Sequence, residues 1–132
     1  SFQHWIYANP GHSREERAQV WLSIRDRFGS NMDWNGHSDF RELSWQQQGH
    51  LYGVPFYYIE YGIAQLGSLQ LWKTHTSDPE KALVNYAKAM TLGNTKSLPE
   101  LFSAAGLKLG FDEGHFYSLL GEVGSALEKL PA

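Results

Sequence analysis

The stretch VPFYYIEYGIAQLGSLQLW, residues 54–72, is apolar or small at most of its positions. Only Glu60, Gln65, Ser68 and Gln70 interrupt its apolar, aromatic and small residues. A helix that is hydrophobic nearly all round either spans a membrane or lies in a protein core among other helices. Its length is at the limit for a span, but Glu60, the two glutamines and the flanking Pro55 argue against lipid. The stretch therefore predicts a buried central helix at about residues 54–74.

The segments on either side carry signals for further helices. Capping-box patterns, in which a serine is followed three residues later by a glutamate, start at Ser13, Ser77 and Ser97. Asp112 suits the N-cap of a last helix to about residue 129, and Gly29 suits the C-cap of the helix that follows Ser13. Few stretches alternate between polar and apolar residues as strands do. We therefore predict an all-α fold: a multi-helix orthogonal bundle around the central helix, formed by a single domain over residues 1–132.

Composition limits the classes of function. With 132 residues, 42% of them hydrophobic, the chain can form one domain with a substantial core. The net charge is −3 and the basic residues are scattered, so neither nucleic acid nor a membrane surface is an expected partner. The absence of cysteine excludes disulfides and thiolate metal sites. The aromatic opening with Phe2, Trp5 and Tyr7 suggests a piece of a longer polypeptide, and we expect any dimer of the fragment to form there.

Polar side chains that could take part in a reaction lie near the start of the central stretch. On a helix, Tyr61 would share a face with Tyr57 and with Tyr58, because it follows them by four and three residues. His50 precedes them, and the turn at residues 53–55 could fold it back toward them. One histidine and two or three phenols around one cavity are hydrogen-bond donors suited to an oxyanion. Buried tyrosines also commonly bond to the backbone and do nothing else, so spacing alone leaves both interpretations open.

Other motifs are weaker. The six histidines form no H-E-x-x-H motif and no pair four residues apart, so we predict no metal site within the chain. Glu60 is expected to form a structural ion pair. Residues 78–93, DPEKALVNYAKAMTLG, resemble one helix of a tetratricopeptide unit, but no second copy follows at a fixed period.

Five segments occur in an order and spacing that resemble the C-terminal region of the oligoendopeptidase F family. They are FQHWIY (2–7), SREER (13–17), PFYYIEYGIAQLGSLQLW (55–72), DPEKALVNYAKAMTLG (78–93) and SLPELFSAAG (97–106). Members of this family are zinc metallopeptidases related to thimet oligopeptidase. The resemblance covers essentially the whole chain.

The resemblance implies a mostly helical, cytoplasmic enzyme that hydrolyses short peptides. His50, Tyr58 and Tyr61 match the histidine and the tyrosine pair that hydrogen-bond the substrate and the tetrahedral intermediate in the family, and Tyr57 is a further candidate for substrate binding. Zinc in the family is held by an H-E-x-x-H helix and a later glutamate, both upstream of this region. The implied partners are peptide substrates and the rest of the peptidase chain. We therefore expect this chain alone to bind no catalytic zinc and to cleave no peptide.

An alternative belongs to another class of function. The chain could be a non-catalytic helical interaction domain that keeps the fold of the peptidase's C-terminal part. An H-E-x-x-H motif upstream in the parent protein would favour the enzyme, and its absence would favour the interaction domain.

Overall fold

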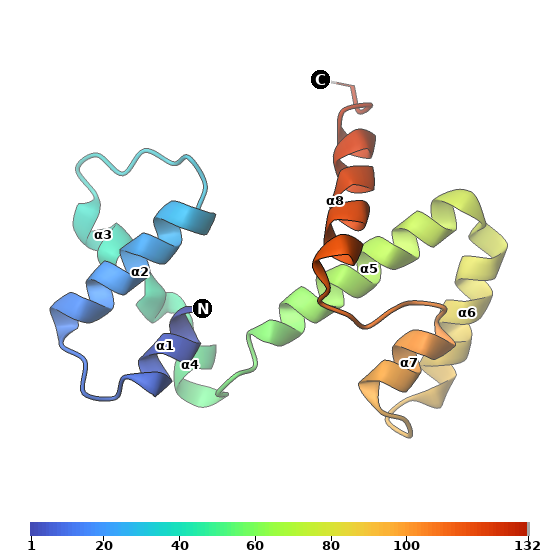
Figure 1. Cartoon of the computed structure of the whole chain (residues 1–132), viewed down its shortest axis with the longest axis horizontal. Coiled ribbons are helices and arrows are strands. Elements are labelled where there is room, and N and C mark those ends of the chain that lie inside the picture. Colours follow the sequence, from blue (N-terminus) through green and yellow to red (C-terminus); the bar gives the residue numbers. More distant parts are fainter. Residues whose placement is uncertain (132) are drawn as a thin grey trace. The chain divides into compact units, whose positions relative to one another are not determined.

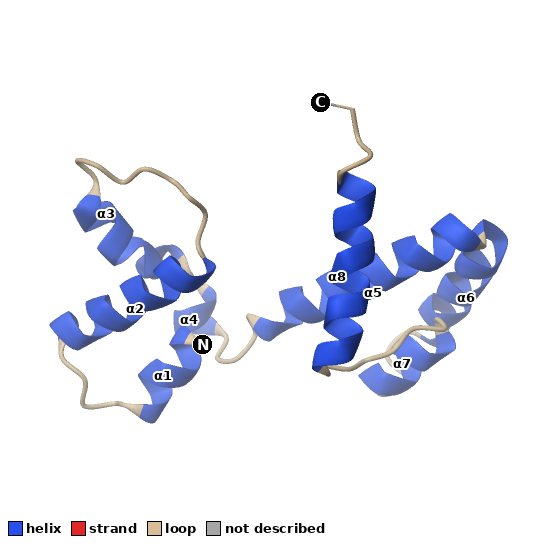
Figure 2. Cartoon of the chain, turned by 45° about the horizontal axis from the view of Figure 1, so that its top comes forward, coloured by secondary structure: helices blue, strands red, loops and turns tan. Residues whose placement is uncertain are grey.

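The computed structural model describes residues 1–131, which form eight α-helices and one short 3-10 helix, with no strand among them (Figures 1 and 2). The predicted all-α class is confirmed. The chain divides into two compact units, one from Ser1 to Ile59 and one that begins at Glu60. The expectation of a single domain over residues 1–132 stays a prediction.

The first unit is built from short helices around one longer helix. Ser13 caps the longer one as predicted: its hydroxyl accepts from the backbone N–H of Glu16 at 3.1 Å, and its own N–H donates to the Glu16 carboxylate at 2.7 Å. Gly29 is the C-cap of the same helix, again as predicted. The elements of this unit are α1 (Phe2–Ala8), α2 (Arg14–Phe28), α3 (Ser38–Leu43), a 3-10 helix (Ser44–Gln47) and α4 (His50–Gly53).

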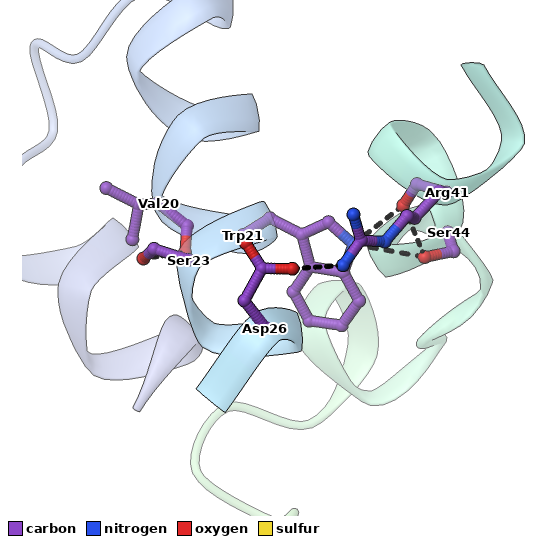
Figure 3. Close-up of polar contacts among 6 residues, drawn as sticks. All are labelled: Val20, Trp21, Ser23, Asp26, Arg41 and Ser44. Carbon is purple, nitrogen blue, oxygen red and sulfur yellow. Dashed lines mark hydrogen bonds and ion pairs between the residues drawn. The ribbon is translucent and has the colours of Figure 1, made fainter. Parts of the chain in front are cut away.

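Aromatic side chains form the core of the first unit. Phe2 and Trp45 are buried, and the Phe2 ring lies 5.0 Å from the ring of Trp21 and 5.7 Å from that of Trp45. The indole N–H of Trp21 points at both the Arg41 carbonyl oxygen and the Ser44 hydroxyl, each 3.0 Å away (Figure 3). Phe2 therefore belongs to the interior of this unit, and the expectation that a dimer of the fragment forms near Phe2, Trp5 and Tyr7 stays a prediction.

An ion pair adds to the contact between α2 and α3. Arg41 of α3 donates to the carboxylate of Asp26 on α2 (Figure 3). The Asp26 side chain is 64% exposed, so the pair contributes little stability on its own. The part-buried indole of Trp21 and its two acceptors are the stronger link between these helices.

The second unit consists of four helices and their caps. Ser97 and Glu100 form the predicted capping box, and Asp112 caps the last helix by accepting from the N–H of His115 at 2.9 Å. The predicted cap at Ser77 is wrong: Asp78 accepts from the N–H of Lys81 at 3.1 Å, and Ser77 is the last residue of the preceding helix. The helices are α5 (Ile59–Ser77), α6 (Pro79–Leu92), α7 (Leu98–Ala104) and α8 (Glu113–Leu127), and α6 packs against α7.

The central stretch becomes α5, but two expectations about it are wrong. The helix starts at Ile59 rather than near residue 54, because residues 54–58 form turns and Phe56 has a left-handed φ of 62°. It is also not buried all round: Leu66, Gly67 and Gln70 are its buried residues. Ile59, Tyr61 and Trp72 of this helix are exposed. Within residues 1–131, no helix is both long and apolar enough to cross a membrane.

A close approach explains one glycine of α5. The α5 backbone meets the ring of Phe102 on α7 at Gly67, where an added Cβ would lie 3.1 Å from the Phe102 Cζ atom. Gly67 is therefore the residue that lets α7 lie directly on α5.

Candidate functional site

The candidate residues lie on the short helix α4, in the turn that follows it and at the start of α5. After α4, the N–H of Val54 donates to the carbonyl of His50 at 3.1 Å, and the N–H of Tyr57 donates to the carbonyl of Val54 at 3.2 Å. Tyr57 and Tyr58 thus lie in a turn and not on a helix. The prediction that they share a helical face with Tyr61 is wrong, because the left-handed residue 56 delays the helix until Ile59.

The turn brings three of the four candidate side chains together, and we call His50, Tyr57 and Tyr58 the His50 cluster. The imidazole of His50 is parallel to the Tyr57 ring, with an interplanar angle of 4° and a centroid distance of 5.2 Å. The Tyr58 ring meets the same imidazole edge-on, at 84° and 5.3 Å. Offset stacking and edge-to-face contact are the favoured arrangements of aromatic rings, so both tyrosines help to fix the orientation of the imidazole.

Tyr58 also lines a cavity of the first unit. The cavity has a volume of about 490 Å³, within the range of small-molecule sites, and its wall is mostly apolar. Tyr58 is 41% exposed. It therefore connects the His50 cluster with a concave surface that could receive part of a ligand. The other lining residues are Ser1, Phe2, Gln3, His4, Trp21, Ile24, Gln48, Leu51, Phe56 and Ile59.

Tyr61 and Glu60 lie in the first turn of α5, in the second unit. The Tyr61 side chain is 54% exposed. Glu60 is also exposed and takes part in none of the ion pairs of residues 1–131. The expected structural ion pair of Glu60 is thus not found, because no cation lies close enough to it in the described part of the chain.

The described residues do not form a zinc site. Across residues 1–131, no three histidine, aspartate or glutamate side chains lie together in a way that could hold a metal ion. A catalytic zinc needs three protein ligands with one position left open.

Sequence reasoning missed two residues that contact the candidate segment. The hydroxyl of Tyr7 donates to the carbonyl of Leu51 at 3.1 Å, and the Tyr7 ring meets Phe56 edge-on at 5.1 Å. From the sequence, Tyr7 is recognised only as part of the aromatic N-terminal segment. Phenylalanine normally avoids a left-handed φ, so the sequence gives no signal for that conformation at Phe56. The long separation between Tyr7 and Leu51, 44 residues, puts this contact beyond any local pattern.

Comparison with known proteins points to peptidases. No protein-family model and no curated protein matches the chain. The chain is similar to the solved structure of PZ peptidase A with inhibitor 2, with a TM-score of 0.89 and 33% identity over 98% of this chain and 23% of that one. It is also similar to the X-ray structure of an oligoendopeptidase F, with a TM-score of 0.82 and 33% identity over the same shares of the two chains.

These two likenesses confirm the resemblance at a coarse level. In fold and sequence, the chain is similar to one part of peptidases of the oligoendopeptidase type. It spans 23% of the length of each of these structures.

Proposed function

We propose that this chain is the C-terminal part of a zinc-dependent oligoendopeptidase that hydrolyses short peptides in the cytoplasm. Within that enzyme, His50, Tyr58 and Tyr61 supply hydrogen bonds to the substrate and the tetrahedral intermediate, and Tyr57 assists in substrate binding. The zinc ligands belong to the rest of the peptidase chain, which is the partner of this part. The chain alone binds no catalytic zinc and is inactive.

One observation carries this proposal. Tyr58 contacts the imidazole of His50 with its ring edge and also lines the cavity of about 490 Å³. A peptide placed against that cavity has a phenol and an imidazole close to one another. The similarity to two peptidases over 98% of the chain supports peptide hydrolysis as the chemistry.

The contribution of these side chains is electrostatic. The carbonyl oxygen of a scissile peptide gains negative charge as it becomes tetrahedral, and an O–H or N–H donor already aimed at it lowers the barrier. Tyr58, Tyr61 and His50 can each donate such a bond. The contacts of Tyr57 and Tyr58 with the imidazole reduce the reorganisation needed when the charge develops.

Replacing the phenol of Tyr58 in the longer protein tests the proposal. Tyr58→Phe removes one donor and should lower kcat about 100- to 1,000-fold on a fluorogenic peptide, with KM changed far less. Tyr52→Phe is the matched control: it removes a phenol of α4 whose ring stacks on Trp45 and should leave the kinetics unchanged. An effect on KM alone would show that Tyr58 binds the substrate without stabilising the transition state.

Experiments on the longer protein also distinguish the two candidate functions, the enzyme and the non-catalytic interaction domain. The longer chain should contain an H-E-x-x-H motif upstream and should lose activity on chelation of zinc. If it has no such motif and cleaves no peptide, the proposal fails and the non-catalytic helical domain is the better assignment. Stoichiometric zinc with peptide turnover in the 132-residue chain alone would contradict the assignment of the ligands to other segments.

A further inference from the structure

Tyr7 contacts the segment that carries the His50 cluster at two places, one in α4 and one in the turn that follows it. Its hydroxyl accepts from the side-chain amide of Gln3 at 3.2 Å and donates to the carbonyl of Leu51 at 3.1 Å. Its ring meets the ring of Phe56 edge-on, at 73° and 5.1 Å. One side chain of α1 therefore holds α4 by a hydrogen bond and the following turn by an aromatic contact.

The two residues that Tyr7 contacts are direct neighbours of the candidate residues. Leu51 follows His50, and Phe56 precedes Tyr57. A shift of either neighbour moves one of the two rings that lie parallel at 5.2 Å. The stacking of His50 on Tyr57 thus depends on a fixed distance between the start of α4 and the end of the turn.

Phe56 makes this dependence stronger. Its φ of 62° lies in the left-handed region, which costs free energy for a bulky residue with a Cβ. Such a conformation persists only where surrounding contacts hold it. Phe56 is 59% exposed, and the Tyr7 ring is an aromatic partner that contacts it.

We propose that Tyr7 and Phe56 form a clamp that fixes the turn at residues 54–58 and thereby sets the geometry of the His50 cluster. Tyr7 is a positioning residue: it acts through Leu51 and Phe56 and does not touch the substrate. The geometric part of this inference is independent of any activity. Its kinetic consequence rests on the proposed function.

The geometry is tested by NMR of the 132-residue chain with Tyr7→Phe. This variant keeps the ring and loses only the hydroxyl, so the bond to the Leu51 carbonyl and the bond from the Gln3 side chain are removed. The carbon-bound protons of the His50 imidazole lie beside the Tyr57 ring and feel its ring current. Their chemical shifts should move toward those of a free imidazole. Tyr117→Phe, at a 72% exposed tyrosine of α8, should leave them unchanged.

Phe56→Gly is the second variant, because glycine adopts a positive φ without strain and has no ring for Tyr7 to contact. It should move the His50 signals in the same direction and broaden those of Tyr57. Unchanged His50 signals in both variants, with helix content retained by circular dichroism, would overturn the clamp. If Tyr7→Phe fails to fold, the result with Phe56→Gly decides.

Kinetics of the longer protein then separate this inference from the proposed function. Tyr7→Phe should lower kcat about 2- to 10-fold, as expected for the loss of the ordinary hydrogen bond to the Leu51 carbonyl, with KM little changed. If the NMR signals move but kcat does not, the clamp stands and the catalytic role of the His50 cluster fails. If Tyr58→Phe slows the reaction but Tyr7→Phe leaves the His50 signals unchanged, the proposed function stands and the clamp is wrong.

Discussion

Gln70 of α5 forms two hydrogen bonds with the backbone of Lys108, one in each direction. Its side-chain oxygen accepts from the N–H of Lys108 at 2.9 Å, and its side-chain nitrogen donates to the carbonyl of Lys108 at 2.9 Å. Gln70 is 8% exposed, so these bonds tie the segment between α7 and α8 to the core of the second unit.

Gln70→Leu should lower the free energy of unfolding by about 1–3 kcal/mol, because it leaves a partly buried N–H and carbonyl without partners. The measurement is urea unfolding of the chain, together with hydrogen exchange at the Lys108 amide, which should lose protection. Gln65→Leu is the control on the exposed side of the same helix and should change stability by less than about 0.5 kcal/mol. Equal stability of the two variants would show that the Lys108 backbone finds other partners.

Alanine substitutions at two glycines of α5 should change the stability of the fold in opposite directions. An alanine at Gly62 meets no atom within 4 Å and should stabilise the helix by about 0.5–1 kcal/mol, since alanine favours helix over glycine. An alanine at Gly67 would place its Cβ 3.1 Å from the Phe102 Cζ atom, so the overpacking should outweigh the same gain and lower the stability by about 1 kcal/mol. Thermal unfolding of both variants checks this. A stabilising Gly67→Ala would mean that the Phe102 ring moves aside freely.

Stability of the second unit should fall in acid through Asp112. Its pKa is lowered from the ordinary value of 3.8, first by the hydrogen bond from the Lys108 side chain and then by the N–H of His115. A carboxyl with a lower pKa in the folded state stabilises the fold above its unfolded pKa, and that contribution is lost as the pH falls through the folded value. The loss should therefore begin below about pH 4.

The neutral analogue separates this titration from the cap itself. Asp112→Asn keeps an N-cap oxygen for the His115 N–H but cannot titrate. The variant should be less stable than the wild type at pH 7, and the difference should shrink as the pH is lowered toward 2, when followed by the helix signal in circular dichroism. A constant difference across this range would rule out a contribution from the Asp112 charge.

The parts of this fold that the sequence predicted are local ones. Ser13 and Ser97 were recognised as caps because a glutamate follows each of them by three residues, and Asp112 because aspartate suits an N-cap; the structure confirms all three. The prediction of Ser77 as a cap is wrong because Asp78, one residue later, also has a side chain suited to an N-cap. The pattern alone cannot show which of two adjacent candidates is the cap.

The parts that failed depend on contacts between distant residues. Apolar periodicity gave the core helix but not its start, because the left-handed Phe56 is held by Tyr7 from another helix. The sequence predicted that the turn at residues 53–55 could fold His50 back toward the tyrosines. It also predicted a helical face shared by Tyr57, Tyr58 and Tyr61, which is wrong because Tyr57 and Tyr58 lie in the turn. Their stacked and edge-on arrangement comes from the turn.

Tyr61 gives the last prediction, and it concerns the transition state. In the longer protein, Tyr61→Phe should lower kcat about 100- to 1,000-fold and change KM far less, since it removes a donor proposed to act mainly on the tetrahedral intermediate. Tyr86→Phe removes the phenol of another half-exposed tyrosine of the second unit and should leave kcat unchanged.

A double variant, Tyr58→Phe with Tyr61→Phe, tests whether the two phenols act together. If both phenols serve one oxyanion, the double variant should lose less than the product of the two single losses, because residues that act as a unit are not additive. A loss equal to that product would mean that the two tyrosines act independently.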